Sequence, residues 1–99
     1  MIIYKQALLS ETGIAVLELP FQTANEARDN ILKIALQNGS PYIWYNALDK
    51  PHKSFILVCI GTGHDHPEFD LKDYVGTVVM ESGYVWHYLL LDSPDEGER

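Results

Sequence analysis

Short hydrophobic segments alternate with clusters of turn-forming residues along the chain, and this pattern predicts β-strands. The first two strands are expected at residues 2–8 and 14–19, the second ending at Pro20. The polar segment between them contains Gly13, which predicts that the two strands form a β-hairpin. The segment 54–61 is almost continuously apolar, so we expect a strand that is buried on both faces.

The clearest predicted hairpin joins strands at 74–80 and 84–91, with Ser82-Gly83 as a two-residue turn. This turn would pair Val78 with His87 and Val79 with Trp86. One face then carries mainly aliphatic residues together with His87, and we expect it to face the core: Val78, Met80, Val85, His87, Leu89 and Leu91. The other face is either a second core layer or a partner-binding surface, with Tyr84, Trp86 and Tyr88 as candidate interface residues. A different turn type would reverse the two faces.

Residues 23–37 allow two interpretations. The segment Thr23-Ala24-Asn25-Glu26 has the form of a capping box, which begins a helix. Apolar residues at helical spacing continue this helix toward Gly39. Alternatively, one short helix near residues 24–30 is followed by a strand at 31–37, and Asn38-Gly39 turns the chain into a further strand at 41–47. Periodicity alone slightly favours the longer helix.

The composition fits one small domain, because the chain has 99 residues of which 46% are hydrophobic. We expect this domain to cover residues 1–92 and an acidic, disordered tail to cover 93–99. The single cysteine, Cys59, has no partner for an intrachain disulfide, which favours a reducing compartment. Without a signal-peptide pattern or an apolar segment of about 20 residues, we expect a cytoplasmic protein with no membrane partner.

The formal net charge is −7, and the excess of acidic residues follows Lys50. A negative surface repels the nucleic acid backbone, so no nucleic acid polymer is expected as a partner. The charge also disfavours a nucleotide ligand, unless several cationic side chains gather locally from the following set: Lys5, Arg28, Lys33, Lys50 and Lys53. Trp44 presents a ring that would stack on a base, although we expect it in the core.

The segment Gly61-Thr62-Gly63-His64 is the most conspicuous motif. Two glycines at a strand end let the backbone approach a ligand and expose N–H groups to an anion. The motif lacks the lysine of a phosphate-binding loop, so a tight turn that needs positive φ is the alternative interpretation. The candidate ligand-binding residues are Gly61, Thr62, Gly63, His64, Trp86 and His87.

His64 and His66 project to the same side of an extended segment, where they could share zinc or manganese with His52 or Asp70. Loops often carry such residues without a ligand, so neither a resident metal nor another cofactor is expected. Cys59 lies within an apolar strand and is expected to act as a small hydrophobic residue. No catalytic set can be assigned from these residues.

Nearly the whole chain is covered by short motifs whose order can be compared with that in other proteins. They are Ile3-Tyr4-Lys5, Leu17-Glu18-Leu19-Pro20, Ile31-Leu32, Gln37-Asn38-Gly39, Trp44, Ile60-Gly61-Thr62-Gly63-His64, Val75-Gly76-Thr77 and Val85-Trp86-His87. In this order the sequence resembles a family of small, uncharacterised proteins encoded mainly by bacteriophages and prophages. The resemblance implies a short β protein, which favours the strand at 31–37. The chain departs from the family pattern in its longer segment 21–29, where we place the helix, and in His66.

We therefore expect a mainly β fold: a small antiparallel β-sandwich or barrel of six or seven strands with one short helix. The favoured function is that of a phage-encoded, non-enzymatic binding protein in the host cytoplasm, acting in counter-defence. It would sequester a nucleotide signal or inhibit a host protein. The alternatives are a minor structural or assembly protein of the phage, and a metal-dependent hydrolase using His64 and His66. The aromatic hairpin face is also compatible with a homo-oligomer.

Overall fold

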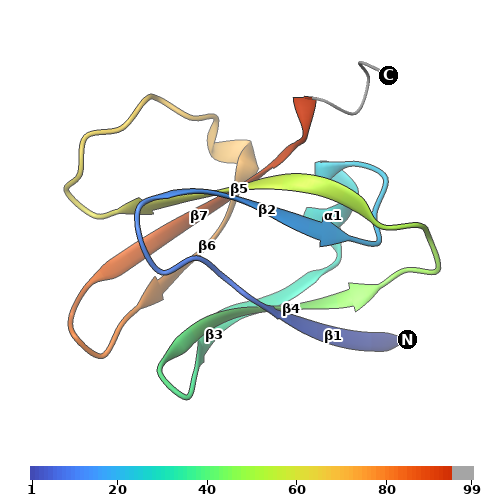
Figure 1. Cartoon of the computed structure of the whole chain (residues 1–99), viewed down its shortest axis with the longest axis horizontal. Helices are drawn as coiled ribbons and strands as arrows, with labels where there is room; N and C mark the ends of the chain where they lie inside the picture. Colours follow the sequence, from blue (N-terminus) through green and yellow to red (C-terminus); the bar gives the residue numbers. More distant parts are fainter. Residues whose placement is uncertain (95–99) are drawn as a thin grey trace.

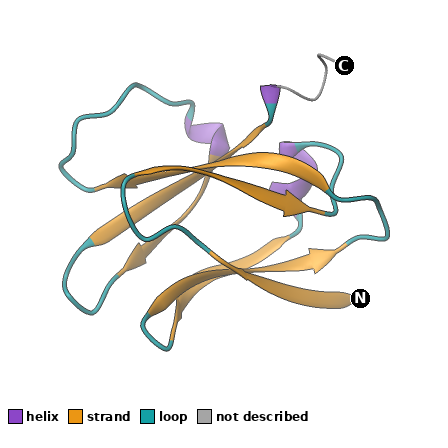
Figure 2. Cartoon of the chain, viewed as in Figure 1, coloured by secondary structure: helices purple, strands orange, loops and turns teal. Residues whose placement is uncertain are grey.

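The alternating apolar pattern produces seven strands in two antiparallel sheets, as the computed structural model of residues 1–94 shows (Figure 1). The three-stranded sheet has the order β1 (Ile2–Ala7), β4 (Ser40–Ala47), β3 (Ile31–Gln37). The four-stranded sheet has the order β2 (Gly13–Leu19), β5 (Lys53–Gly61), β7 (Val85–Asp92), β6 (Tyr74–Val79). The elements within residues 1–94 also include the α-helix α1 (Ala24–Asp29) and the 3₁₀ helix η1 (Leu71–Asp73), both purple in Figure 2. Most of the expected tail, residues 95–99, lies outside the described part.

The inner faces of the two sheets enclose the main core. Ile43 and Tyr45 of β4 face Leu57 of β5 and Tyr88 of β7, and Ala27 of α1 closes one end. The largest fully buried side chains are Tyr88, Phe21, Phe55, Leu19, Ile43, Leu57 and Leu90. The predicted fold class, a mainly β antiparallel sandwich or barrel of six or seven strands with one short α-helix, is confirmed, with seven strands in two sheets.

The predicted N-terminal hairpin is wrong. β1 pairs with β4 and β2 pairs with β5, so the first two strands belong to different sheets. The link between them is part of the structure rather than a free turn: Leu8 is buried and its N–H donates to the Pro41 carbonyl oxygen at 3.0 Å. Because Leu8 is buried between β1 and β2, the chain passes through the core as it crosses from one sheet to the other.

The segment 23–37 follows the second interpretation. Thr23 caps α1 by accepting a hydrogen bond from the Glu26 N–H, and α1 ends at Asp29. β3 then pairs with β4 through a tight turn in which Asn38 and Gly39 have φ of 54° and 81°. The strand and its turn are confirmed, and the longer helix is wrong.

Neither helix within residues 1–94 is long and apolar enough to cross a membrane.

The last hairpin forms, but its predicted register is wrong by one residue. Val78 lies opposite Trp86 and Thr77 lies opposite His87. The connection is longer than two residues, because the Met80 N–H donates to the Tyr84 carbonyl oxygen at 2.7 Å, with Gly83 at a φ of 98°. This shift exchanges the two faces of β7 relative to β6.

As a result, the inner face of the hairpin carries Trp86, Tyr88 and Leu90 of β7. Trp86 packs against the main core and Tyr88 is fully buried in it. His87 and Leu89 lie on the outer face of the four-stranded sheet, contrary to the expectation that they face the core. Placing Tyr88 on an exposed interface was therefore wrong, whereas Tyr84 is 64% exposed.

Candidate functional site

The outer face of the four-stranded sheet is apolar and is partly covered by the loop that follows β5. Val58, Ile60 and Leu89 point away from the main core, yet they are only 6%, 5% and 3% exposed. Phe69 of the loop and Tyr74 at the start of β6 pack against them and form a second, smaller core. This cover explains the near-continuous apolar sequence of β5, which was expected to be buried on both faces.

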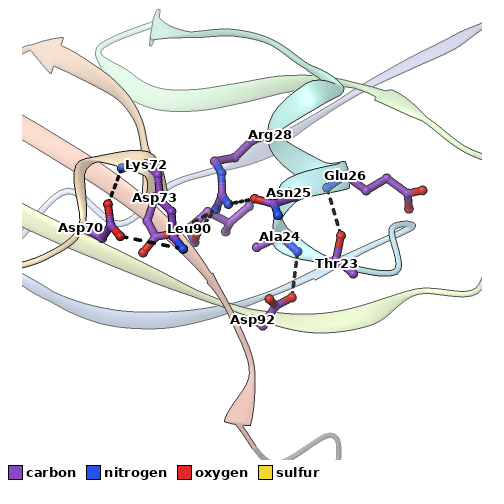
Figure 3. Close-up of polar contacts among 10 residues, drawn as sticks. All are labelled: Thr23, Ala24, Asn25, Glu26, Arg28, Asp70, Lys72, Asp73, Leu90 and Asp92. Carbon is purple, nitrogen blue, oxygen red and sulfur yellow. Dashed lines mark hydrogen bonds and ion pairs between the residues drawn. The ribbon is translucent and has the colours of Figure 1, made fainter.

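Polar contacts hold the far end of this loop to the rest of the protein (Figure 3). Asp70 caps η1 by accepting a hydrogen bond from the Lys72 N–H at 3.0 Å. Arg28 of α1 lies 3.5 Å from the Asp73 carboxylate and donates a 2.6 Å hydrogen bond to the Leu90 carbonyl oxygen. One arginine thus links α1, β7 and η1.

A cavity of about 490 Å³ lies between the loop and the sheet. Its walls are mainly apolar, formed by Ile60, Phe69, Leu71, Tyr74 and Leu89. Polar groups come from Thr62, His66, Glu68 and His87, and Gly61 and Gly63 complete the lining. A concave, mostly apolar cavity of this size with a few polar groups is typical of small-molecule sites.

His87 is the centre of a hydrogen-bonded cluster at one wall of the cavity. Its Nε2 is 2.6 Å from Thr62 Oγ1, and its Nδ1 is 2.7 Å from the Tyr74 hydroxyl and 3.2 Å from Thr77 Oγ1. The Tyr74 and Thr77 hydroxyls also contact each other. Hydroxyl groups both donate and accept hydrogen bonds, so this cluster accommodates either tautomer of the ring.

The same cluster is poorly suited to covalent catalysis. Thr62 and His87 lie within proton-transfer distance, as a hydroxyl nucleophile and its base would. However, both contacts at the second ring nitrogen come from hydroxyls, whereas a carboxylate orients the histidine of a hydrolytic triad. Cys59 is buried in the main core, and this burial raises the pKa of its thiol and disfavours a thiolate.

His64 and Trp86 do not line this cavity. Gly61 lies opposite Trp86 in the β5–β7 ladder, and the Trp86 side chain faces the inner side of the sheet, where it packs against the main core. His64 folds over the same side, with its ring 6.4 Å from the Trp86 ring and its Nδ1 3.1 Å from Thr12 Oγ1. The six candidate ligand-binding residues therefore divide into two groups, with Gly61, Thr62, Gly63 and His87 at the cavity.

The Gly61–His64 segment forms a tight turn in which two backbone donors are already used. The His64 N–H donates to the Gly61 carbonyl oxygen at 3.2 Å, and the Thr62 N–H donates to the Val85 carbonyl oxygen at 3.1 Å. Gly63 has a φ of 84°, which a glycine adopts at low cost. This geometry agrees with the tight-turn interpretation and leaves fewer N–H groups for an anion.

His66 makes contacts different from those of His64. It stacks on Phe69 with ring centroids 6.2 Å apart, and its Nδ1 is 2.8 Å from the Pro67 carbonyl oxygen. Across residues 1–94, no three His, Cys, Asp or Glu side chains gather in a way that suits a metal ion. The ligand set considered for His64 and His66 is therefore not assembled in the described chain.

Tyr84 and Trp86 remain adjacent at the hairpin end, with stacked rings 6.0 Å apart. Of the three candidate interface residues, these two reach the surface.

The sequence analysis missed Phe69, Leu71 and Tyr74 as parts of the site. One signal was available for Phe69, because it is an aromatic residue in an otherwise acidic loop and phenylalanine is usually buried.

The chain was compared with known proteins and protein families. No curated protein and no solved structure matches it. One family model, described as a domain of unknown function (DUF7352), matches residues 3–98. The match covers nearly the whole chain, and the chain therefore belongs to the DUF7352 family.

Proposed function

We propose that this protein is a non-enzymatic binding protein whose ligand site is the cavity under the 62–70 loop. The observation that carries the proposal is the cavity itself, with apolar walls and one hydrogen-bonded cluster centred on His87. Phe69 and Leu71 belong to the covering segment, so movement of this segment would admit a ligand to the buried sheet face.

The lining of the cavity favours an uncharged, largely apolar ligand with one hydrogen-bonding group. Glu68 is the charged side chain of the lining, which otherwise contains His66 and His87 and neither lysine nor arginine among the described residues. A phosphate would therefore meet a carboxylate without a compensating cation. The hydroxyls around His87 offer both donors and acceptors to a ligand hydroxyl, carbonyl or ring nitrogen.

The biological setting of this activity is proposed from the phage resemblance alone. A phage-encoded protein of this kind would act in the host cytoplasm, and removal of a small host signal would serve counter-defence. Inhibition of a host protein would instead use the stacked aromatic pair of the exposed Tyr84 and the half-buried Trp86.

The proposal is tested with N-phenyl-1-naphthylamine, an uncharged apolar dye that fluoresces in apolar surroundings. We expect saturable binding to the wild-type chain. Leu71→Glu introduces a charge at the cavity lining and should abolish this binding without unfolding the protein, because Leu71 is 81% exposed.

Val79→Glu is the matched control, since Val79 is an exposed apolar residue of β6 outside the cavity lining. This variant should bind the dye as the wild type does. Equal loss of binding in both variants, or no saturation with the wild type, would overturn the proposal.

A further inference from the structure

The outer face of the three-stranded sheet carries an aromatic side chain between two cations. Trp44 of β4 lies opposite Lys5 of β1 in one ladder and opposite Lys33 of β3 in the other. Directly paired residues share a face, so both lysine side chains lie on the same face of the sheet as the indole. Trp44 was expected in the core, but its neighbours Ile43 and Tyr45 take the buried positions and Trp44 points outward.

A second ring extends this surface. Tyr42 lies two residues before Trp44 on the same face, with ring centroids 6.1 Å apart. The Lys5 ammonium lies 4.9 Å from the centre of the Tyr42 ring and also bonds to the Gln37 side chain. A hollow of about 380 Å³ lies beside Trp44, lined also by Lys33, Ala35 and Gln37. We call Lys5, Lys33, Gln37, Tyr42 and Trp44 the Trp44 face.

The charge of the Trp44 face opposes that of the whole molecule. The chain carries a net charge of −7, yet strands β1, β3 and β4 contain no acidic residue. Within residues 1–94, the ion pairs involve Arg28, Lys50 and Lys72, and neither Lys5 nor Lys33 pairs with a carboxylate. Their ammonium groups are therefore available to an anionic ligand.

We propose that the Trp44 face binds a free nucleotide, with its base stacked on Trp44 and its phosphate between Lys5 and Lys33. Aromatic rings stack on any nucleobase, and lysine ammonium groups bind phosphate as point charges. Gln37 supplies both a donor and an acceptor to the base edge or sugar. Two cations suffice for one phosphate group, whereas the overall negative charge opposes a long polyanion. This site is separate from the cavity, whose lining disfavours phosphate.

Titration with ADP, followed by amide and indole NMR signals, tests the proposal. Saturable shifts should appear in β1, β3, β4 and the Trp44 indole, and affinity should fall as salt is added. Replacement of the stacking ring in Trp44→Leu should weaken ADP binding roughly tenfold. The double variant Lys5→Gln/Lys33→Gln should weaken ADP binding and remove most of its salt dependence, while weak binding of adenosine persists.

Because both lysines are exposed, this double variant stays folded even if Trp44→Leu does not. Lys72→Gln and Tyr84→Leu are matched controls, replacing an exposed lysine and an exposed aromatic residue outside the Trp44 face. Leu71→Glu should leave ADP binding intact, which separates this site from the cavity. Shifts confined to the cavity, equal loss in the control variants, or tighter binding of a short oligothymidylate than of ADP would overturn the proposal.

Discussion

The Tyr88 hydroxyl donates a 2.8 Å hydrogen bond to the carbonyl oxygen of Leu9. Tyr88 belongs to β7 in the four-stranded sheet, and Leu9 lies in the link through which the chain leaves the three-stranded sheet. The bond therefore holds the link between the sheets to the centre of the core, where the tyrosine ring is fully buried.

Tyr88→Phe should lower the free energy of unfolding by about 1 kcal/mol, because the Leu9 carbonyl loses its donor while the ring is kept. Urea unfolding at neutral pH measures this change. Tyr84→Phe removes a hydroxyl from a ring that is 64% exposed and should change stability by less than about 0.5 kcal/mol. Equal effects of the two substitutions would contradict a structural role for the Tyr88 bond.

Stability should fall in alkaline solution, and Tyr88 should contribute to that fall. Burial, and secondarily the neighbouring Cys59, raises the pKa of Tyr88 above its ordinary value of 10.0. The unfolded chain then loses the phenolic proton at lower pH than the folded chain does. The stabilising contribution is fully present below pH 10.0 and is lost as pH rises through the folded pKa.

Urea unfolding at increasing pH measures this dependence. Burial also raises the pKa of Cys59 and of Tyr45, so Tyr88→Phe should reduce the alkaline loss without removing it. An unchanged slope in Tyr88→Phe would show that the Tyr88 phenol does not contribute.

Gly61→Ala should destabilise the protein by about 1–3 kcal/mol through overpacking. A methyl group at this position would lie 2.7 Å from His64 Nδ1 and 3.0 Å from Trp86 Cζ3. The second substitution His64→Ala should restore part of the loss, since it removes the closer contact.

Gly63→Ala provides the comparison for Gly61→Ala. Nothing surrounds this position, but its φ of +84° strains a residue with a side chain, at a cost of about 1 kcal/mol. His64→Ala should not relieve that cost. Thermal unfolding of the single and double variants measures how much stability His64→Ala restores to Gly61→Ala and to Gly63→Ala.

Arg28→Lys should loosen the covering loop of the cavity, because lysine cannot reach Leu90, Asn25 and Asp73 together as the guanidinium does. Hydrogen exchange should become faster in η1, and stability should fall by about 1–3 kcal/mol. Lys72→Ala breaks an ion pair whose side chains are 72% and 60% exposed, and should cost less than about 0.5 kcal/mol. Unchanged exchange in η1 would contradict the anchoring role of Arg28.

The strands could be predicted from the sequence because alternation is a local property, but their assembly into sheets is not local. The segment around Gly13 signals a change of direction, and that signal is the same whether the next strand pairs with the previous one or joins another sheet. In the last hairpin, Gly83 fits both a two-residue and a three-residue turn. The difference of one residue in turn length decides whether Trp86 or His87 faces the core.

The candidate site was predicted in part for a related reason. Trp86 and His87 are consecutive in one strand, so they face opposite sides of the sheet and cannot both line a pocket on one face. Gly61, Thr62, Gly63 and His87 do meet at the cavity. Phe69 and Leu71 reach it only because the loop folds back on the sheet, which depends on contacts far apart in the sequence.

The assignment of the first two strands to different sheets has a consequence for synthesis of the chain. β1 acquires its partner only when the ribosome has completed β4 at Ala47, and β2 must wait for β5 to end at Gly61. Until then, the apolar residues of both strands are exposed on the nascent chain, while the β3–β4 hairpin can already form from neighbouring residues. The β3–β4 hairpin is thus the earliest native element to which β1 can attach, whereas β2 has no native partner until β5 has been synthesised.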